Sequence, residues 1–305
     1  MSDFPRIAVL MGGPGSERKV SLASGGAVLG ALQGLGLDAV GVDVTTTDVV
    51  LPDGVGLAFN VIHGTFGEDG QLQEKLEALG VPYTGAGVVS SRTAFDKNLA
   101  KEAFKAAGVP TPGAEIVDVS GGVRLPSLAV PFVVKPPREG SSVGVHVVKD
   151  AAQAQAAMED AAKYGNDILV EEFVEGLELT VGVLDDVALP IVHIIPPEGV
   201  YDMASKYPWL SGAKGSTYIC PAELDEETTK VVQEAALAAH RALNVEVYSR
   251  VDVLLDAQKR PFVLEVNTIP GMTETSLLPK SATASGIGFP ELCQMIARLS
   301  LELRT

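Results

Sequence analysis

VYSRVDVLLDAQKRPFVLEVN, residues 247–267, is the most informative segment of the chain. Its two ends alternate apolar and polar residues around a polar centre, which predicts two strands joined by a turn. If the hairpin is symmetric about the middle of that turn, Asp252 lies opposite Glu265. The same register places Arg250 opposite Asn267. Because alternate residues of a strand point to one face of a sheet, these polar side chains are expected to lie together.

The polar face of this predicted hairpin has the composition of a metal site. Two carboxylates a few ångströms apart repel each other unless a cation lies between them, and oxygen ligands of this kind suit Mg²⁺. The alternative is a solvent-exposed face with a surface Asp–Arg pair. Leu254 and Val263, both expected on the same face, argue against open exposure. The opposite face is expected to pack on the core through Val251, Val253, Leu264 and Val266.

A second candidate site is a loop between two short strands. Residues 130–135 read as a strand that ends at Lys135, and PPREGSSVGV follows at 136–145 before a second strand to Lys149. Backbone N–H groups of such a loop and a lysine ammonium are the donors that polyphosphate oxygens require. The chain has no GxxxxGK[ST] motif, which excludes a P-loop. An ordinary hairpin turn is the alternative.

The loop after the first predicted strand, GGPGSE at 12–17, partly matches a dinucleotide-binding fingerprint. The third glycine of that fingerprint would fall at position 18, where the chain has Arg18. A bulky residue there obstructs close approach of helix and strand, so a Rossmann cofactor has weak support even though Asp43 ends a second strand. We instead expect the helix N-terminus to bind a small ligand, with Glu17 pointing into the cleft to meet an amine.

Farther along, DILVEEF at 167–173 reads as an apolar strand that ends in two carboxylates. Adenine is often bound by backbone donors and acceptors of an extended connector, with an acid at the ribose hydroxyls. Glu171 and Glu178 are candidates for such contacts. This segment alone supports equally well the alternative that both acids are solvated at the end of the strand and bind no ligand.

Composition narrows the class of protein. The 305 residues are 46% hydrophobic, too apolar for a disordered chain, and carry a net charge of −16. That charge argues against nucleic acid or an anionic membrane as the main partner. The two cysteines, Cys220 and Cys293, argue against a disulfide scaffold or a zinc site. With no window near ~18 apolar residues and no signal peptide, we expect a cytoplasmic protein.

The order of the predicted elements indicates a mixed α/β and α+β architecture. In the first 95 residues, strands alternate with helices, as in parallel α/β packing; the strands are expected at 6–11, 38–44 and 57–62, and the helices at 16–35 and 70–79. The middle region reads as α+β, with helices at 97–107 and 151–164. Residues 197–218 have no clear period and are expected to form a long functional loop. Two helices follow, from an N-cap at Asp225 to about 243 and over 289–303.

Taken together, these segments resemble the ATP-grasp superfamily, and within it the D-alanine–D-alanine ligases, over essentially the whole chain. The matching motifs occur in the family's order and spacing: GGPGSERKVSLASG at 12–25, HGTFGEDG at 63–70, PYTGAG at 82–87, DKNLAK at 96–101, VVKPPREGSSVG at 133–144, SKYP at 205–208, RVDVLLD at 250–256 and LEVNTIPGMTETSLLP at 264–279. The resemblance implies an ATP-grasp fold of three domains, 1–96, 97–180 and 181–305, with the nucleotide between the last two. It also implies a lid loop at about 197–218 and a homodimer.

The resemblance further implies a role for each site residue. The residues expected at ATP are Lys97, Lys135 and Lys206 for the phosphates, Glu171, Glu172 and Val174 for adenine, and Glu178 for ribose. The ligands expected for two Mg²⁺ ions, for which Mn²⁺ can substitute, are Asp252, Glu265 and Asn267. The residues expected at D-alanine are Glu17 and His63 for the first molecule and Ser276 for the carboxylate of the second. A hydrogen-bonded set of Glu17, Ser141 and Tyr207 would cross the cleft.

The implied reaction is the joining of two D-alanine molecules through a D-alanyl phosphate. The first carboxylate attacks the γ-phosphorus of ATP, and the amine of the second D-alanine attacks the resulting acyl phosphate. Arg250 and the backbone N–H of Gly271 would form the oxyanion hole. Tyr207 favours the dipeptide, because relatives that accept D-lactate have histidine at the matching position.

Two other functions are compatible with parts of this sequence. Another ATP-grasp enzyme that joins a carboxylate to an amine or thiol would share Lys97, Lys135 and the hairpin, without the Glu17–Ser141–Tyr207 set. A catalytically silent protein that binds ATP as a regulatory ligand is the third hypothesis, and the intact metal-ligand candidates argue against it. Ser249 and Ile269 depart from the commoner family pattern.

Overall fold

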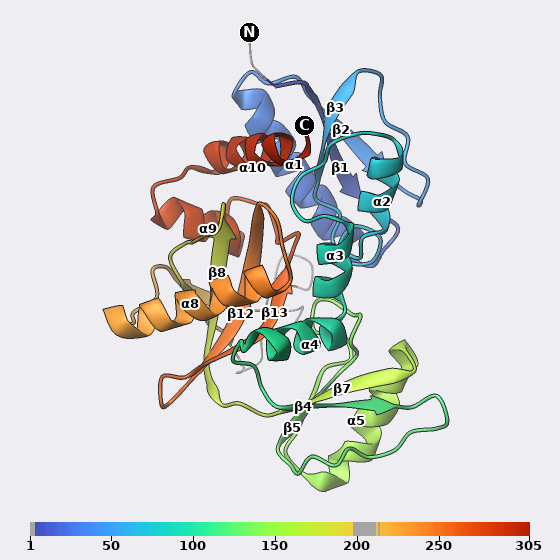
Figure 1. Ribbon diagram of the computed structural model, residues 1–305, viewed down its shortest axis with the longest axis vertical. Coiled ribbons are helices and arrows are strands. Elements are labelled where there is room, and N and C mark those ends of the chain that lie inside the picture. The colour runs from blue at the N-terminus through green and yellow to red at the C-terminus, as the bar shows by residue number, and fades with distance from the viewer. Residues whose placement is uncertain (1–3, 198–211, 213) are drawn as a thin grey trace.

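The computed structural model describes residues 4–197, 212 and 214–305. Within these ranges the strands form three sheets, which follow one another along the long axis of the molecule (Figure 1). The mixed α/β and α+β class expected from the sequence is confirmed. No described helix is both long enough and apolar enough to cross a membrane.

The first sheet is parallel, with strand order β2-β1-β3. Its strands are β1 (Arg6–Gly12), β2 (Ala39–Val44) and β3 (Val55–Asn60), and its helices are α1 (Arg18–Gly34) and α2 (Gln71–Ala78). Alternate residues of β1 enter two different cores, since Ile7 and Val9 pack toward α1 while Ala8 and Leu10 pack toward α2. Burial on both faces is what a parallel sheet requires. The predicted strand and helix alternation of this region is therefore confirmed.

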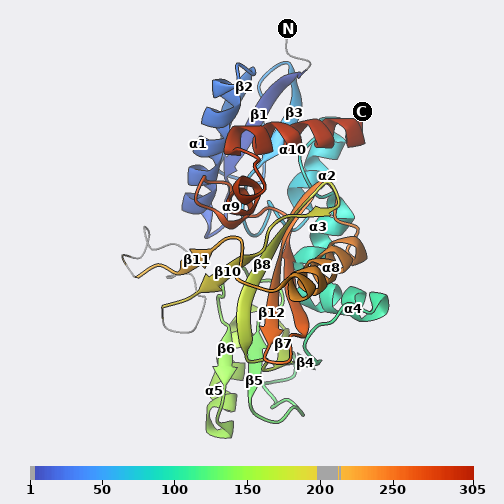
Figure 2. The ribbon, with the colours of Figure 1, turned by 90° about the vertical axis from the view of Figure 1, so that its left-hand side faces the viewer.

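The second sheet is antiparallel, with strand order β4-β7-β5-β6. Its strands are β4 (Ala114–Asp118), β5 (Phe132–Lys135), β6 (His146–Val148) and β7 (Asp167–Glu172), covered by α5 (Ala154–Ala161), which short 3₁₀ turns at Ala151–Gln153 and Ala162–Tyr164 extend. Strand β5 pairs with β6, with Phe132 opposite Val148, so the predicted hairpin around the 136–145 loop is confirmed. Figure 2 shows this sheet and α5 at the end of the molecule opposite to β1.

The third sheet is antiparallel, and its main path runs β11-β10-β8-β12-β13. Its strands are β8 (Gly176–Leu184), β9 (Val187–Ala188), β10 (Val192–Ile195), β11 (Thr217–Ile219), β12 (Tyr248–Asp256) and β13 (Pro261–Asn267). One face packs on α8 (Glu226–Ala242) and α4 (Lys97–Ala107), as Figures 1 and 2 show. The edge strand β11 overlaps the end of the predicted 197–218 loop, because Thr217 and Tyr218 lie in this strand.

The hairpin register is confirmed at the residues that matter, with Asp252 opposite Glu265 and Arg250 opposite Asn267. The expected symmetry is wrong beyond Asp252, because a β-bulge shifts the register and Val253 pairs with Val263. Val263 is therefore in the core, and Leu264, expected there, is only partly buried. The extra residue in β13 means that the residues of β13 before Glu265 point to the opposite faces from those expected.

Helix ends follow local capping chemistry. Asp225 caps α8 by accepting from Thr228 N at 2.8 Å, and Glu226 and Glu227 occupy its first turn, as predicted. Asp96 caps α4 in the same way. Helices α3 (Val88–Phe95) and α9 (Leu277–Ala284) were not expected, whereas α10 (Phe289–Arg304) was. The division at 96 and 180 stays a prediction; residue 180 lies inside β8.

Candidate active site

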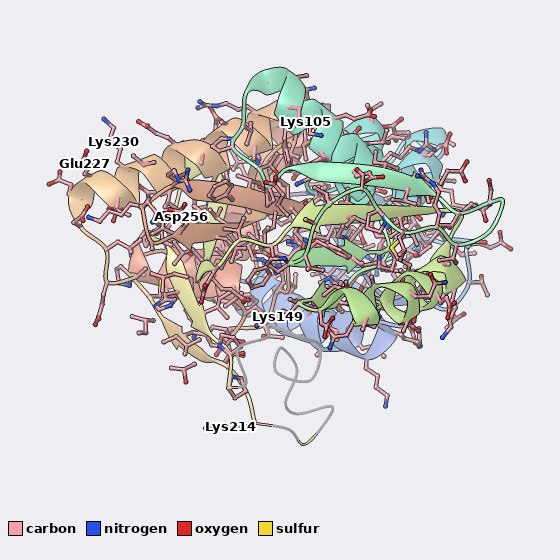
Figure 3. All side chains as sticks on the ribbon, turned by 90° about the horizontal axis from the view of Figure 1, so that it is seen from below. Lys105, Lys149, Lys214, Glu227, Lys230 and Asp256 are labelled. Atoms are coloured by element: carbon pink, nitrogen blue, oxygen red, sulfur yellow. The ribbon has the colours of Figure 1, made fainter. Side chains whose placement is uncertain are left out.

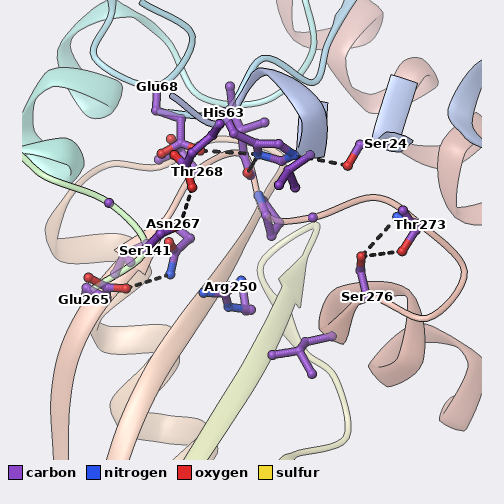
Figure 4. Close-up of a pocket in the computed structure, with 18 of the residues that line it drawn as sticks. Ser24, His63, Glu68, Ser141, Arg250, Glu265, Asn267, Thr268, Thr273 and Ser276 are labelled. Carbon is purple, nitrogen blue, oxygen red and sulfur yellow. Dashed lines mark hydrogen bonds and ion pairs between the residues drawn. The ribbon is translucent and has the colours of Figure 1, made fainter. Parts of the chain in front are cut away.

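A cavity of about 280 Å³ lies where the first and third sheets and the 136–145 loop meet. Figure 4 shows its polar side chains converging from separate segments. Of the residues expected at the site, those that line this cavity are Glu17, His63, Lys97, Ser141, Arg250, Glu265, Asn267, Gly271 and Ser276. The structure thus brings together residues that are more than 250 positions apart in the chain.

The polar face of the β12–β13 hairpin forms one wall. Arg250 Nε donates to Asp252 Oδ1 at 2.9 Å, and its Nη2 donates to Asp252 Oδ2 at 2.8 Å. Lys97 Nζ lies 3.4 Å from Glu265 Oε2 and donates to the Glu139 carbonyl at 2.8 Å. Asn267 Nδ2 lies 3.3 Å from Asp252 Oδ2 and 3.5 Å from Glu265 Oε1. Each carboxylate is thus balanced by a cation, and the amide lies between them.

The chemistry of this wall fits Mg²⁺, because two carboxylates and a side-chain amide converge and each has an oxygen ligand. In this structure Asn267 turns its Nδ2 toward both acids, so its amide would rotate to present the oxygen to a cation. Thr180 Oγ1 donates to Asp252 Oδ1 at 2.6 Å and helps to fix that carboxylate. Over the described ranges, no group of three or more His, Cys, Asp or Glu side chains is arranged to hold a metal ion. A cation here would therefore depend on the amide of Asn267, and on ligands from outside the protein, as well as on the two acids.

Glu17 faces this wall from the loop before α1. It accepts a hydrogen bond from Ser141 Oγ, so the residue before α1 meets the 136–145 loop. Backbone geometry allows the approach: a Cβ at Gly64, where φ is +72°, would come within 2.6 Å of Glu17 Oε2. Ser141 itself has a φ of 52°, in the left-handed region that non-glycine residues seldom adopt. The hydrogen bond to Glu17 is made from this conformation.

His63 is buried beside Glu17 and has partners on both ring nitrogens (Figure 4). Its Nδ1 donates to the Ile269 carbonyl at 2.9 Å and lies 3.5 Å from Glu68 Oε1. Its Nε2 is 3.1 Å from Ser24 Oγ, which accepts from Met272 N at 3.2 Å. Burial opposes protonation of His63, but the hydrogen bond and charge of Glu68 outweigh it and raise the pKa of His63.

Glu68 was not identified from the sequence. Burial raises the pKa of its carboxyl, and His63 only partly offsets that effect. The signal was available, because Glu68 lies in the same HGTFGEDG segment, on the loop that also carries His63. The departure at Ile269 leaves this network intact, since His63 uses only the backbone carbonyl of that residue.

Lys135 and Glu171 are paired outside the lining of this cavity, on the second sheet. Glu171 forms ion pairs with both Lys135 and Lys101. Burial alone would raise the pKa of Glu171, but the two lysine charges outweigh it and hold that pKa below its usual value. The structure thus gives Glu171 two cationic partners, and its contact with adenine stays a prediction.

Lys101 was missed by sequence reasoning. Its side chain is 3% exposed, and Nζ donates to Thr111 Oγ1 at 2.6 Å and to the Pro112 carbonyl at 3.1 Å. Burial lowers its pKa. Lys101 is the last residue of DKNLAK and lies four positions after Lys97, on the same face of α4.

The other residues expected at the nucleotide lie near the same sheet. Glu172 ends β7, and its backbone N–H donates to the Gly113 carbonyl at 2.8 Å. Val174 follows in the connection to β8, which carries Glu178 opposite Leu254. Lys206 and Tyr207 lie outside the described residues. Glu172, Val174 and Glu178 therefore follow one another along β7, the connection and β8, and Lys206 and Tyr207 are untested.

Arg18 and Asp43 also have an explanation. Arg18 Nη2 lies 2.7 Å from Asp43 Oδ2, and Nη1 donates to the Val44 carbonyl at 3.2 Å. A Cβ at Gly12 would come within 2.4 Å of both side chains. Arg18, at the position of the fingerprint's third glycine, is thus paired with the acid that ends the second strand.

Gly271 and Ser276 define the far side of the cavity. A Cβ at Gly271 would lie 2.9 Å from Ser276 Oγ, closer than side chains tolerate. Ser276 is the N-cap residue of α9, and its Oγ accepts from Thr273 N at 3.1 Å (Figure 4). The glycine thus lets the chain at 271 pass close to the serine, so that both lie at the cavity wall.

The comparisons with known proteins agree with one another. The family model described as D-ala D-ala ligase C-terminus matches residues 123–298, and that described as D-ala D-ala ligase N-terminus matches residues 43–86. A D-alanine–D-alanine ligase of Methylacidiphilum infernorum is 46% identical over 298 residues, which is 97% of this chain and 96% of that protein. One of Geobacter sulfurreducens is 45% identical over 304 residues, 98% of this chain and 95% of that protein.

Solved structures extend this similarity to the fold. The D-alanine–D-alanine ligase of Bacillus anthracis complexed with ATP superposes with a TM-score of 0.83 at 32% identity, covering 99% of each chain. The VanG D-Ala:D-Ser ligase of Enterococcus faecalis superposes with a TM-score of 0.82 at 26% identity, covering 97% of this chain and 99% of that chain.

Proposed function

The chain belongs to the D-alanine–D-alanine ligase family, and we propose from that premise how its own residues divide the work. It has the ATP-grasp fold and is an ATP-dependent ligase that forms D-alanyl-D-alanine for peptidoglycan precursor synthesis, releasing ADP and phosphate. The observation that carries the assignment of roles is the meeting of Glu17 and Ser141 with the polar face of the hairpin in one cavity.

Glu17 binds the ammonium of the first D-alanine. Its carboxylate reaches the cavity at the start of α1, and Ser141 holds one of its oxygens, which leaves the other for a cationic ligand. His63, fixed by Ile269 and Ser24, lies beside it and packs against the same substrate. A substrate held in this way presents its carboxylate toward the hairpin wall, where the nucleotide phosphates are expected.

Lys97 and Lys135 approach the phosphates from α4 and β5. Each ammonium faces a carboxylate, Glu265 and Glu171 respectively. Such pairing keeps both cations near the site, and phosphate oxygens would take over part of their hydrogen bonding. Glu171, Glu172, Val174 and Glu178 provide the adenosine contacts along β7 and β8, and Lys206 adds a cation from the 197–218 segment.

Asp252, Glu265 and Asn267 would hold Mg²⁺. When bound, the metal neutralises charge on the transferring phosphoryl group and orients its oxygens. Arg250 and the Gly271 N–H lie on the same cavity and would stabilise the oxyanion that forms when the second amine attacks the acyl phosphate. Ser276 meets the carboxylate of that second D-alanine, and Tyr207 would favour an amine over a hydroxy acid.

Steady-state phosphate release tests this assignment. With Mg-ATP, we expect phosphate release with D-alanine and none with L-alanine, and chromatography of the products formed with D-lactate or D-serine added beside D-alanine should show D-alanyl-D-alanine as the main product. Absence of D-alanine-dependent turnover would contradict the function, and preference for D-lactate would overturn the role of Tyr207.

We also propose an oligomeric state, a location and a division into domains. Resemblance to the family supports a cytoplasmic homodimer and the three domains 1–96, 97–180 and 181–305. Sedimentation of the purified protein at micromolar concentration should give about twice the 31.7 kDa mass of the chain. A species of 31.7 kDa over the whole concentration range would contradict the dimer.

A further inference from the structure

The charges along the cavity are unequally distributed. The acidic residues that line it are Glu17, Glu68, Glu139 and Glu265, and the basic ones are Lys97, Arg250 and Lys280. Both D-alanine molecules bring a carboxylate into these surroundings, and a carboxylate is expensive to bind next to acids unless a cation faces it. The way in which each cation is already used therefore decides where a substrate carboxylate can lie.

Two of the three cations are engaged by acids of the hairpin. Arg250 makes two hydrogen bonds with Asp252, and Lys97 lies 3.4 Å from Glu265. Lys280 differs: among the residues that the structure describes, it forms no ion pair with a carboxylate, and its Nζ lies over the Tyr218 ring, 5.8 Å from the centroid. A cation over an aromatic face keeps much of its ability to bind an anion.

Lys280 is also in the right place. It lies in the first turn of α9, and its backbone N–H donates to the Ser276 carbonyl at 2.9 Å. Residues four positions apart lie on one face of a helix, which places Lys280 one turn beyond Ser276 along the cavity. The Cys220 thiol donates to the Lys280 carbonyl at 3.8 Å and ties this turn to the chain just after β11. The lysine therefore comes from a packed helix.

We propose that Lys280 binds the carboxylate of the second D-alanine beside Ser276 and so selects an acceptor that carries a carboxylate. This inference rests on the proposed function, because it concerns the acceptor of that same reaction. The ammonium supplies a charge-assisted hydrogen bond, and Ser276 supplies a neutral one. Holding the acceptor by its carboxylate turns its amine toward Arg250 and Gly271, where the acyl phosphate is expected.

Lys280→Met removes the charge and keeps the length and apolar stem of the side chain. Loss of one charge-assisted hydrogen bond should raise the KM for the second D-alanine by about 10- to 100-fold, with kcat much less affected. The KM for ATP and oxygen-isotope exchange within ATP driven by the first D-alanine should stay at the wild-type values. Lys280→Arg, which restores the charge, should recover most of the loss.

Acceptor choice gives the second readout. The wild type should strongly prefer D-alanine over D-alaninamide, which has no carboxylate, and Lys280→Met should reduce that preference in proportion to its loss of affinity for D-alanine. Lys230→Met is the matched control, because Lys230 extends into solvent from α8 (Figure 3) and should change neither value. Thermal midpoints of all variants show whether folding is affected.

The outcomes are distinct. A KM for the second D-alanine within twofold of wild type in Lys280→Met, or an unchanged preference over D-alaninamide, would overturn the proposal. So would an equal rise in the KM values for both D-alanine molecules, since that would mean general disturbance of the cavity. Wild-type protein without D-alanine-dependent turnover would instead contradict the proposed function itself.

Discussion

Glu265 is the residue at which catalysis and folding can be separated most clearly. Its side chain is 29% exposed and pairs with Lys97 at 3.4 Å, so the pair should contribute less than about 1 kcal/mol to the free energy of unfolding. As a proposed metal ligand it should matter far more for turnover. We expect Glu265→Gln to lower kcat on the order of 100-fold or more while the free energy of unfolding stays within about 1 kcal/mol. Parallel urea titration and phosphate-release assays check this, and comparable loss of both would make the hairpin acids structural.

His240 provides a test of pH dependence at one residue. It is buried on α8, its Nδ1 lies 2.7 Å from Ser249 Oγ, and burial lowers its pKa from 6.5 to about 4. The unfolded chain therefore binds a proton between those values that the folded chain does not. Stability from this residue should be complete above pH 6.5 and be lost as the pH falls toward 4, by at most about 3 kcal/mol.

His240→Gln isolates that contribution. Between pH 4 and 6.5, the free energy of unfolding of the variant should lack the pH dependence that His240 gives the wild type. The difference in unfolding free energy between the two proteins should therefore shrink as the pH falls. A difference that is constant over this range would show that His240 does not titrate. The Ser249 departure has its explanation here, since the serine hydroxyl is the partner of the buried ring.

At the scale of elements, helix α4 is joined to the second sheet by buried charge. Lys101 and Lys135 both pair with Glu171, and Thr111, which binds Lys101, donates to the Val263 carbonyl of β13 at 2.7 Å. Removing Lys101 is costly, because Glu171 loses one of its two buried ion pairs, and Thr111 Oγ1 and the Pro112 carbonyl lose their buried donor. We expect Lys101→Met to lower the free energy of unfolding by about 3 kcal/mol in urea titrations.

Lys105→Met is the control for that experiment. Lys105 lies in the last turn of α4, is exposed and extends away from the protein (Figure 3), so its substitution should change stability by less than about 0.5 kcal/mol. If both variants lose equal stability, the loss comes from the helix and the buried network adds nothing.

Elements also show where sequence reasoning stops. Period-two alternation predicted the pairs of the hairpin correctly near Asp252, because both strands are regular there. It failed at Leu264, since a bulge leaves no mark in an apolar run whose residues suit either face. Helix α9 was missed because it is short and because a proline in a sequence usually indicates that no helix is present. Pro279 lies in the first turn, where a proline is tolerated.

Lys101 and Glu68 were missed for a different reason. Each is a charged residue that the pattern of a single segment places at the surface. Their burial depends on partners that are distant in the chain or on the packing of a loop, namely Glu171 for the lysine and the cavity around His63 for the acid. Motifs located the site well, whereas the pairing within it needed the three-dimensional structure.

At the scale of the whole molecule, one cavity receives residues from the first sheet, the third sheet and the loop between β5 and β6. A ligand that contacts all three should stabilise the native state as a unit. We expect a non-hydrolysable ATP analogue with Mg²⁺, at 100 times its Kd, to add about 2.7 kcal/mol, or roughly 5 °C in Tm. EDTA should remove most of the shift in the wild type, and Glu265→Gln should show little Mg²⁺ dependence from the start. A shift that is independent of Mg²⁺ in both proteins would contradict the assignment of the metal to the hairpin.

The net charge of −16 is compatible with a nucleotide substrate, because individual cations lie where its phosphates are expected. Lys97, Lys135, Lys280 and Arg250 each lie on or beside the hairpin, the 136–145 loop or α9, and acids hold three of them in place. The site is not positive as a whole, since acids also line it, but it supplies several cations within one region, where phosphate and carboxylate groups can reach them.

The product formed from D-alanine and Mg-ATP tests the central claim most directly. Mass spectrometry of the reaction, with phosphate measured in parallel, should find D-alanyl-D-alanine and phosphate in a one-to-one ratio, and should find dipeptide rather than depsipeptide when D-lactate is present in equal amount. Phosphate released without dipeptide, or no release that depends on D-alanine, would contradict the account.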